Sequence, residues 1–244
     1  MSVYIGKVFI DGELPEESYL KELAAVKYLM KNEIDLGSDV VFFVGENGSG
    51  KSTLLEAIAV SLGFNPEGGT RNFSFSTQDT HSVLSSFLRV GKKRVPRDGF
   101  FLRSESFYNV ASYIDELDRS PSFSPPLIDS YGGKSLHVQS HGESFLALIQ
   151  NRFGGNGLYI LDEPESALSP MRQFVLLGEM KRLVEKNSQF LIATHSPILM
   201  AYPGAKIIEF SEHGLREVDF RQTEHYVITR SFLNDPGKFF EELF

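Results

Sequence analysis

The chain has 244 residues, of which 41% are hydrophobic and 12% aromatic, and a formal net charge of −8. This length and apolar content predict one compact domain with a full core. The acidic balance argues against non-specific nucleic-acid binding over the whole surface, and the absence of cysteine excludes disulfides and thiolate metal sites.

The amino-terminal stretch MSVYIGKVFIDGE lacks the charged start, apolar run and cleavage site of a secretion signal. No window approaches the roughly 20 apolar residues of a membrane span. We therefore expect a soluble, cytoplasmic protein without membrane insertion. A first strand is predicted to end at Asp11 and Gly12. Leu20, Val26 and Met30 then recur at helical spacing, which predicts one helix from Pro15 onward.

Residues 39–44 form a short, nearly continuous apolar run, typical of a strand buried on both faces of a parallel sheet. VGENGSGKST follows at residues 44–53, and Leu54, Leu55 and Ile58 carry a helix onward. A strand, a glycine loop and a helix in this order form the context that a phosphate loop requires.

The glycine loop has the Walker A pattern, in which Gly45 is followed after four residues by Gly50, Lys51 and Ser52. Its glycines let successive backbone N–H groups point at a polyphosphate. Lys51 is expected to reach the β- and γ-phosphates, Ser52 to ligate Mg²⁺, and Thr53 to add a hydrogen bond. The predicted nucleotide-binding residues are Gly45, Glu46, Asn47, Gly48, Ser49, Gly50, Lys51, Ser52 and Thr53.

The middle of the chain carries a basic stretch around Gly91 and Pro96, made of Arg89, Lys92, Lys93, Arg94 and Arg97. A solvated hairpin is favoured here, and a phosphate track for nucleic acid stays open. Residues 72–77 predict an exposed strand, 99–107 a core strand, and 107–117 a helix. Residues 118–135 contain three prolines and several serines, which predicts a long mobile loop.

The stretch LYILDEP at residues 158–164 predicts a buried strand that ends on acid. Asp162 is placed to hold the magnesium shell, and Glu163 to accept a proton from an attacking water. His195 ends another apolar run, FLIAT, 33 residues after Asp162. That separation allows one helix and a return strand, so the imidazole is expected at the same sheet edge, near the γ-phosphate or the lytic water.

The stretch QSHGES at residues 139–144 precedes an amphipathic helix. Ser140 is expected to cap this helix, and Gly142 to leave N–H groups exposed as a second anion site. The stretch lies 22 residues before Asp162. We expect it to be too distant to share the phosphate loop's own nucleotide easily.

Taken together, these fragments resemble the ABC-type ATPase family over about residues 38–200. GENGSGKS matches its Walker A motif, QSHGE stands at its LSGGQ signature, LYILDEP matches Walker B, SALS follows as the D-loop, and His195 fits the switch histidine. The chain is most similar to free-standing soluble ATPases related to the SMC and DNA-repair branch. The resemblance implies an α/β fold: a mixed sheet core with flanking helices and a small helical lobe at 106–145, within a single domain, 1–244.

The resemblance also implies that two copies bind ATP and Mg²⁺ head to tail. Each nucleotide would then face the partner's signature residues, Ser140, His141, Gly142 and Glu143. The implied metal ligands are Ser52, Asp162 and Glu105, the last standing where the family has a glutamine. His141 stands in place of a glycine and Glu143 in place of a glutamine, so altered signature contacts to the partner's nucleotide are expected, and Ser169 stands where the family's D-loop has an aspartate.

We therefore expect a Mg-dependent ATPase in which Lys51, Glu163 and His195 are catalytic. A nucleotide-dependent homodimer would switch a protein client or grip nucleic acid, in DNA repair or in defence. The alternative is an ATP-binding subunit that energises a membrane transporter. The carboxyl-terminal residues 223–244 predict two amphipathic helices with phenylalanine anchors, for which core packing is favoured over a docking surface.

Overall fold

The computed structural model describes residues 3–15, 18–73, 83–119 and 125–244. Its central feature is a six-stranded sheet of order β5-β6-β7-β3-β8-β9, in which β9 alone runs antiparallel to its neighbour. The expected α/β fold with a mixed sheet is therefore confirmed. The strands are β3 (Val40–Gly45), β5 (Asp98–Arg103), β6 (Gly157–Asp162), β7 (Gln189–Ala193), β8 (Lys206–Ser211) and β9 (Gly214–Val218).

A second, antiparallel sheet has the order β2-β1-β4. Its strands are β1 (Ile5–Ile10), β2 (Ile34–Asp35) and β4 (Leu88–Lys92). The hairpin predicted for the basic stretch is therefore wrong, because β4 pairs with β1 whereas the following strand, β5, joins the larger sheet. Leu88 is buried in the core and pairs with Ile10 of β1.

The described residues form nine α-helices. They are α1 (Ala24–Leu29), α2 (Lys51–Ser61), α3 (Leu84–Phe87), α4 (Phe107–Arg119), α5 (His141–Arg152), α6 (Pro170–Glu185), α7 (Pro197–Met200), α8 (Glu224–Asn234) and α9 (Pro236–Leu243). The single helix predicted from Pro15 is divided. A 3₁₀ turn, η1 (Tyr19–Glu22), precedes α1, and Leu23 between them is extended.

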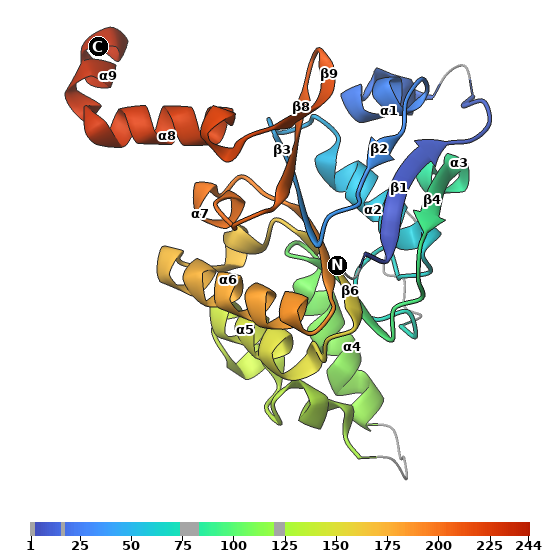
Figure 1. Cartoon of the computed structure of the whole chain (residues 1–244). Helices are drawn as coiled ribbons and strands as arrows, with labels where there is room; N and C mark the ends of the chain where they lie inside the picture. Colours follow the sequence, from blue (N-terminus) through green and yellow to red (C-terminus); the bar gives the residue numbers. More distant parts are fainter. Residues whose placement is uncertain (1–2, 16–17, 74–82, 120–124) are drawn as a thin grey trace.

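Two apolar cores lie on opposite faces of the larger sheet. Alternate residues of β3 divide between them, with Val41 and Phe43 on one face and Phe42 and Val44 on the other. The first core includes α1, α2 and the small sheet, and the second includes α4, α5 and α6 (Figure 1). This explains why the strand is apolar at successive positions: both of its faces are covered.

The segment expected to be a long mobile loop is anchored where the structure describes it. The Asp118 carboxylate accepts hydrogen bonds from the backbone N–H groups of Leu127 and Ile128, and Tyr131 is fully buried. Two short 3₁₀ helices, η2 (Leu127–Tyr131) and η3 (Leu136–Val138), then lead to α5. Most of the exposed strand predicted at 72–77 lies outside the described residues.

The last two helices, α8 and α9, form what we call the C-terminal arm, which projects away from the body (Figure 1). All of α8 is described, and none of its residues is fully buried. The ring of Phe232 contacts those of Phe239 and Phe240, so the anchors pack on one another. The prediction that these helices pack into the core is therefore wrong, and Leu243 and Phe244 are largely exposed.

Candidate active site

The glycine loop joins β3 to α2 and depends on backbone conformations that favour glycine. Gly45, Gly48 and Gly50 have φ values of +137°, +79° and +93°. A Cβ on Gly45 would lie 2.3 Å from the carbonyl oxygen of Phe210 in β8. Side chains are thus excluded at Gly45 by both strain and crowding, and disfavoured by strain at the other two positions.

Lys51 begins α2 and folds back over the loop. Its ammonium donates hydrogen bonds to the carbonyl oxygens of Gly45 at 2.9 Å and Glu46 at 2.7 Å. Burial lowers the pKa of Lys51, whereas the charges of Glu163 and Asp162 act to raise it. A cation held at a glycine loop in this way is positioned to meet the phosphates of a nucleotide.

Ser52 and Asp162 meet although 110 residues separate them, and the Ser52 hydroxyl donates to the Asp162 carboxylate at 2.8 Å. Burial raises the pKa of Asp162 from 3.8 to about 6, an effect that the Ser52 hydrogen bond and Arg103 oppose. Both residues line a cavity of about 310 Å³. Hydroxyl and carboxylate oxygens suit Mg²⁺, so this pair fits the predicted metal site.

Glu163 follows β6 in a left-handed conformation, with φ 48° and ψ 53°. Two hydrogen bonds hold its backbone: its N–H donates to the Ala193 carbonyl at 3.0 Å, and the Ser104 hydroxyl donates to its own carbonyl at 2.7 Å. Its carboxylate lies 3.7 Å from Nε2 of His195. A non-glycine residue held in this conformation marks a site where strain is retained.

His195 lies two residues beyond β7, at the sheet edge where the sequence predicts it. Its backbone N–H donates to the Glu165 carboxylate, and its ring Nδ1 lies 3.0 Å from Nε2 of His225 in α8. Burial lowers the pKa of His195 from 6.5 to about 4, with contributions from Lys51 and His225. Sequence reasoning missed His225, because an isolated histidine in a helix carries no motif.

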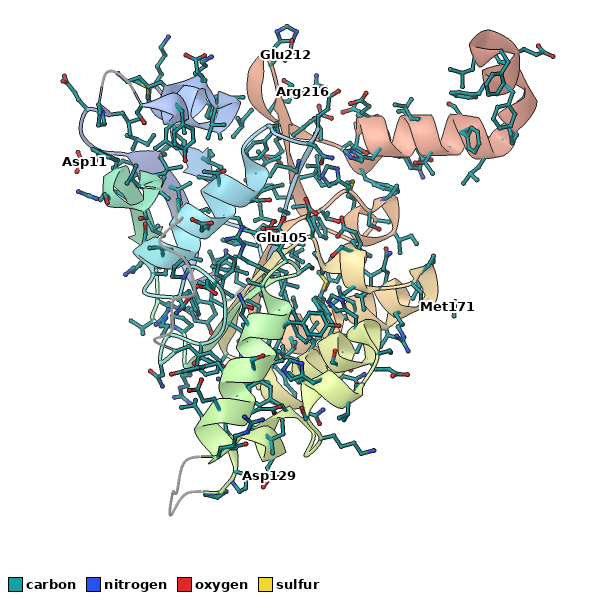
Figure 2. All side chains as sticks on the ribbon, turned by 180° about the vertical axis from the view of Figure 1, so that it is seen from behind. Asp11, Glu105, Asp129, Met171, Glu212 and Arg216 are labelled. Atoms are coloured by element: carbon teal, nitrogen blue, oxygen red, sulfur yellow. The ribbon has the colours of Figure 1, made fainter. Side chains whose placement is uncertain are left out.

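Glu105 precedes α4 and lies at the centre of Figure 2. It lines the same cavity as Ser52 and Asp162, yet its side chain is 89% exposed. Arg103, which the sequence analysis did not single out, ends β5 beside these acids. Its guanidinium lies 2.7 Å from the Glu56 carboxylate, 3.7 Å from that of Asp162 and 3.8 Å from that of Glu105.

The signature segment begins α5, and the predicted cap is confirmed: Ser140 and Glu143 form a reciprocal capping box. Arg172 of α6 donates to both side chains, at 3.3 and 3.0 Å. Gly142 is buried, and a Cβ there would lie 2.7 Å from the Ala167 carbonyl oxygen, so this position has no room for a side chain, and the anion site at the helix start stays a prediction. His141 lines the same cavity as Ser52, Asp162 and Glu163, contrary to the expected separation from the phosphate loop.

Two family models match the chain. Residues 23–119 match one described as "AAA domain", and residues 144–201 match one described as "AAA domain, putative AbiEii toxin, Type IV TA system". These two ranges contain the Walker A loop and the Walker B strand respectively.

Two curated relatives and one solved structure give the wider comparison. The chain is 28% identical over 191 residues to an "Uncharacterized ABC transporter ATP-binding protein" of Haemophilus influenzae, spanning 70% of this chain and 69% of the relative. It is 22% identical over 193 residues to "Hemin import ATP-binding protein HmuV" of Idiomarina loihiensis, spanning 73% and 74%. CbiO1 from Clostridium perfringens, part of the ABC transporter complex cbiONQ, shares the fold over 96% of each chain, with 17% identity and a TM-score of 0.52.

The motifs, their geometry and these matches support an ATPase that is similar to P-loop proteins of the ABC/AAA class. The chain is similar to ABC-type proteins, and the relatives described above are named as transporter ATP-binding proteins rather than as chromosome or repair proteins. No helix in the described part of the chain is long and apolar enough to cross a bilayer.

Proposed function

We propose that two copies of this ATPase close head to tail around MgATP and that hydrolysis reopens them. The observation that carries this proposal is the convergence of Glu163 and His195, 3.7 Å apart, beside the hydrogen-bonded pair Ser52 and Asp162. A base, a phosphate sensor and oxygen ligands for a cation thus share one edge of the sheet. This arrangement suits attack of water on a γ-phosphate.

Each residue has a distinct role in this proposal. Lys51 would exchange its two carbonyl partners for the β- and γ-phosphates. Ser52, Asp162 and Glu105 would hold Mg²⁺, which screens phosphate charge when bound. Glu163 would accept a proton from the attacking water, and His195 would donate an Nε2–H to the γ-phosphate.

The second subunit would contribute its signature residues, Ser140 to Glu143, from the helical lobe at 106–145 of the single domain. The capping box and Arg172 support this part of the proposal, because they hold the start of α5 in one conformation. A preformed helix start can meet a phosphate without first losing conformational freedom.

The test uses Glu163→Gln, which keeps the size of the side chain and removes the base. We expect this variant to bind ATP, to hydrolyse it at least about 100-fold more slowly, and to accumulate as a dimer in MgATP. Lys51→Ala is the control, which should neither bind ATP nor dimerise. Light scattering decides the matter: a Glu163→Gln protein that stays monomeric in saturating MgATP excludes the head-to-tail closure.

For the role of this protein in the cell, we propose that it is an ATP-binding subunit that energises a membrane transporter. The names of the Haemophilus and Idiomarina relatives support this choice over the soluble repair switch that the motifs alone suggest. A tagged full-length chain should then copurify with a membrane protein after mild detergent extraction. Recovery of the chain without any membrane protein would count against the transporter role.

A role in defence or DNA repair is the second candidate. It is supported by the AbiEii-type description of one matching family model and by the exposed basic residues that extend from β4. ATP hydrolysis should then rise when DNA is added, and the double change Lys92→Ala with Arg94→Ala should remove the rise. An ATPase rate that DNA leaves unchanged argues against this candidate.

A further inference from the structure

A second histidine, His225, touches the ring of His195 from the first turn of α8. The helix start is firmly anchored at Thr223, which is fully buried. The Thr223 hydroxyl donates to the Phe220 carbonyl at 2.8 Å and accepts from the backbone N–H of Tyr226 at 3.3 Å. Although no residue of α8 is fully buried, the turn that carries His225 therefore has a fixed position.

The two rings form a pair in which one nitrogen donates and the other accepts. Nδ1 of His195 lies 3.0 Å from Nε2 of His225, within hydrogen-bond distance. Burial, together with the charge of Lys51, lowers the pKa of both imidazoles, so both are neutral near pH 7. A neutral imidazole carries one N–H and one acceptor nitrogen, so the direction of this bond fixes which tautomer each ring adopts.

The groups around His195 indicate which of the two rings donates the hydrogen bond. Its Nε2 lies 3.7 Å from the Glu163 carboxylate, a hydrogen-bond acceptor, and phosphate oxygens are acceptors too. If His195 donated to His225, its Nε2 would present a lone pair to these oxygens. If His225 donates to His195 instead, His195 carries its proton on Nε2, where this N–H can donate a hydrogen bond to one of these oxygens.

We propose that His225 is a positioning residue, whose Nε2–H donates to Nδ1 of His195 and so keeps the N–H of His195 on Nε2, directed at the γ-phosphate. This inference rests on the proposed function, in which His195 senses that phosphate. Nε2 of His195 is buried and has no hydrogen-bond partner in the described part of the protein. A buried donor left without a partner is costly, and an oxygen of the nucleotide would supply the missing acceptor.

The consequence is that the first turn of α8 belongs to the catalytic apparatus without touching the nucleotide. A purely structural role for His225, as an anchor of the arm, is the competing explanation. The two explanations differ in their effect on turnover: an anchor changes stability, whereas a positioning residue changes kcat and leaves the affinity for ATP nearly intact.

The experiment compares the wild-type protein with His225→Ala, His225→Gln and, as a matched control on the same helix, Ile228→Ala. The Ile228 side chain is 50% exposed. We expect His225→Ala to lower kcat about 3- to 10-fold, the effect of one lost hydrogen bond, with little change in KM. Glutamine can donate from a similar position and should restore most of the rate, and Ile228→Ala should match the wild type.

His195→Ala separates failure of this inference from failure of the proposed function. If His195→Ala loses turnover but His225→Ala does not, the positioning role is wrong and the sensor role stands. If His195→Ala retains full turnover, the sensor role itself is wrong. The double variant should be no slower than His195→Ala alone, because His225 acts only through His195.

A spectroscopic measurement on the wild-type protein keeps the inference testable even if His225→Ala fails to fold. With ¹⁵N-labelled histidine, the ring nitrogens of His195 should show the proton on Nε2. Protonation on Nδ1 would overturn the inference. Where His225→Ala folds, we expect its His195 to lose this single tautomer.

Discussion

Replacing Asp162 with asparagine should stabilise the nucleotide-free protein while it destroys the predicted metal site. Asp162 is 7% exposed, and burial raises its pKa from 3.8 to about 6. At neutral pH the folded protein must therefore hold a buried carboxylate in an unfavourable charged form. Asparagine keeps the size and the acceptor for the Ser52 hydroxyl without carrying the charge.

The expected gain in the free energy of unfolding follows from the raised pKa of Asp162. One pH unit of difference in pKa corresponds to about 1.4 kcal/mol, so a rise from 3.8 to about 6 corresponds to about 3 kcal/mol. The variant loses the contact with Arg103 at 3.7 Å, although Arg103 keeps Glu56 at 2.7 Å. We therefore expect a net gain of about 1–3 kcal/mol, or roughly 2–10 °C in Tm.

The raised pKa of Asp162 makes the difference in stability between the wild type and Asp162→Asn depend on pH. Because the folded pKa is raised, the folded wild type binds the proton more tightly than the unfolded chain between about pH 4 and 6. Its stability relative to Asp162→Asn should therefore fall as pH rises through this window and stay constant above it. The gain from the variant is expected to be full at pH 8 and to vanish near pH 4.

The difference in stability between the wild type and Asp162→Asn is measured by thermal unfolding in EDTA without nucleotide. Asp98→Asn is the matched control: burial raises the pKa of Asp98, but the Gly154 N–H and Arg152 outweigh it, and the pKa is lowered. That variant should be less stable than the wild type at pH 8. An Asp162→Asn protein that is no more stable than the wild type at pH 8 would refute the reasoning.

Two further predictions concern the same edge of the sheet. At Gly45, φ is +137° and a Cβ would lie 2.3 Å from the Phe210 carbonyl oxygen, so Gly45→Ala should lose at least about 3 kcal/mol of stability. The control is Gly63→Ala, where φ is +86° and the Cβ would lie in open space, and this variant should lose only about 1–2 kcal/mol. Denaturant unfolding of both variants separates the effect of crowding from that of backbone strain. Because the pKa of His195 is lowered to about 4, its ring signals should not titrate between about pH 6 and 8 in NMR spectra, and a midpoint near 6.5 would contradict the burial that we describe.

Local patterns predicted the phosphate loop and the strands well. The spacing of Gly45, Gly50 and Lys51 indicated strand, loop and helix, and the structure has β3, the loop and α2 at these positions. His195 was also placed correctly. Parallel strands with short connections bring their carboxyl ends to one edge, so a residue after an apolar run can be located without knowing the whole fold.

Predictions that depended on distant contacts failed. The basic stretch indicated a hairpin, yet β4 pairs with β1, about 80 residues earlier in the chain. The phenylalanines of the C-terminal arm suggested a core, but they pack mainly on one another. Arg103 and His225 were missed because their importance comes from neighbours distant in the sequence, which no periodicity in one segment can reveal.

The features that oppose stability gather where β3, β6 and β7 end. Asp162 is a buried acid whose charged form is disfavoured, Glu163 has a left-handed backbone, and Nε2 of His195 is a buried polar atom without a partner. A magnesium-bound triphosphate would remove two of these energetic penalties. Its cation would neutralise the charge of Asp162, and a phosphate oxygen would accept the hydrogen bond from Nε2 of His195. Binding that removes such penalties stabilises the folded state by more than its contacts alone. MgATP should therefore raise the Tm of the wild type more than that of Asp162→Asn, because the variant has no buried carboxylate charge for the cation to neutralise.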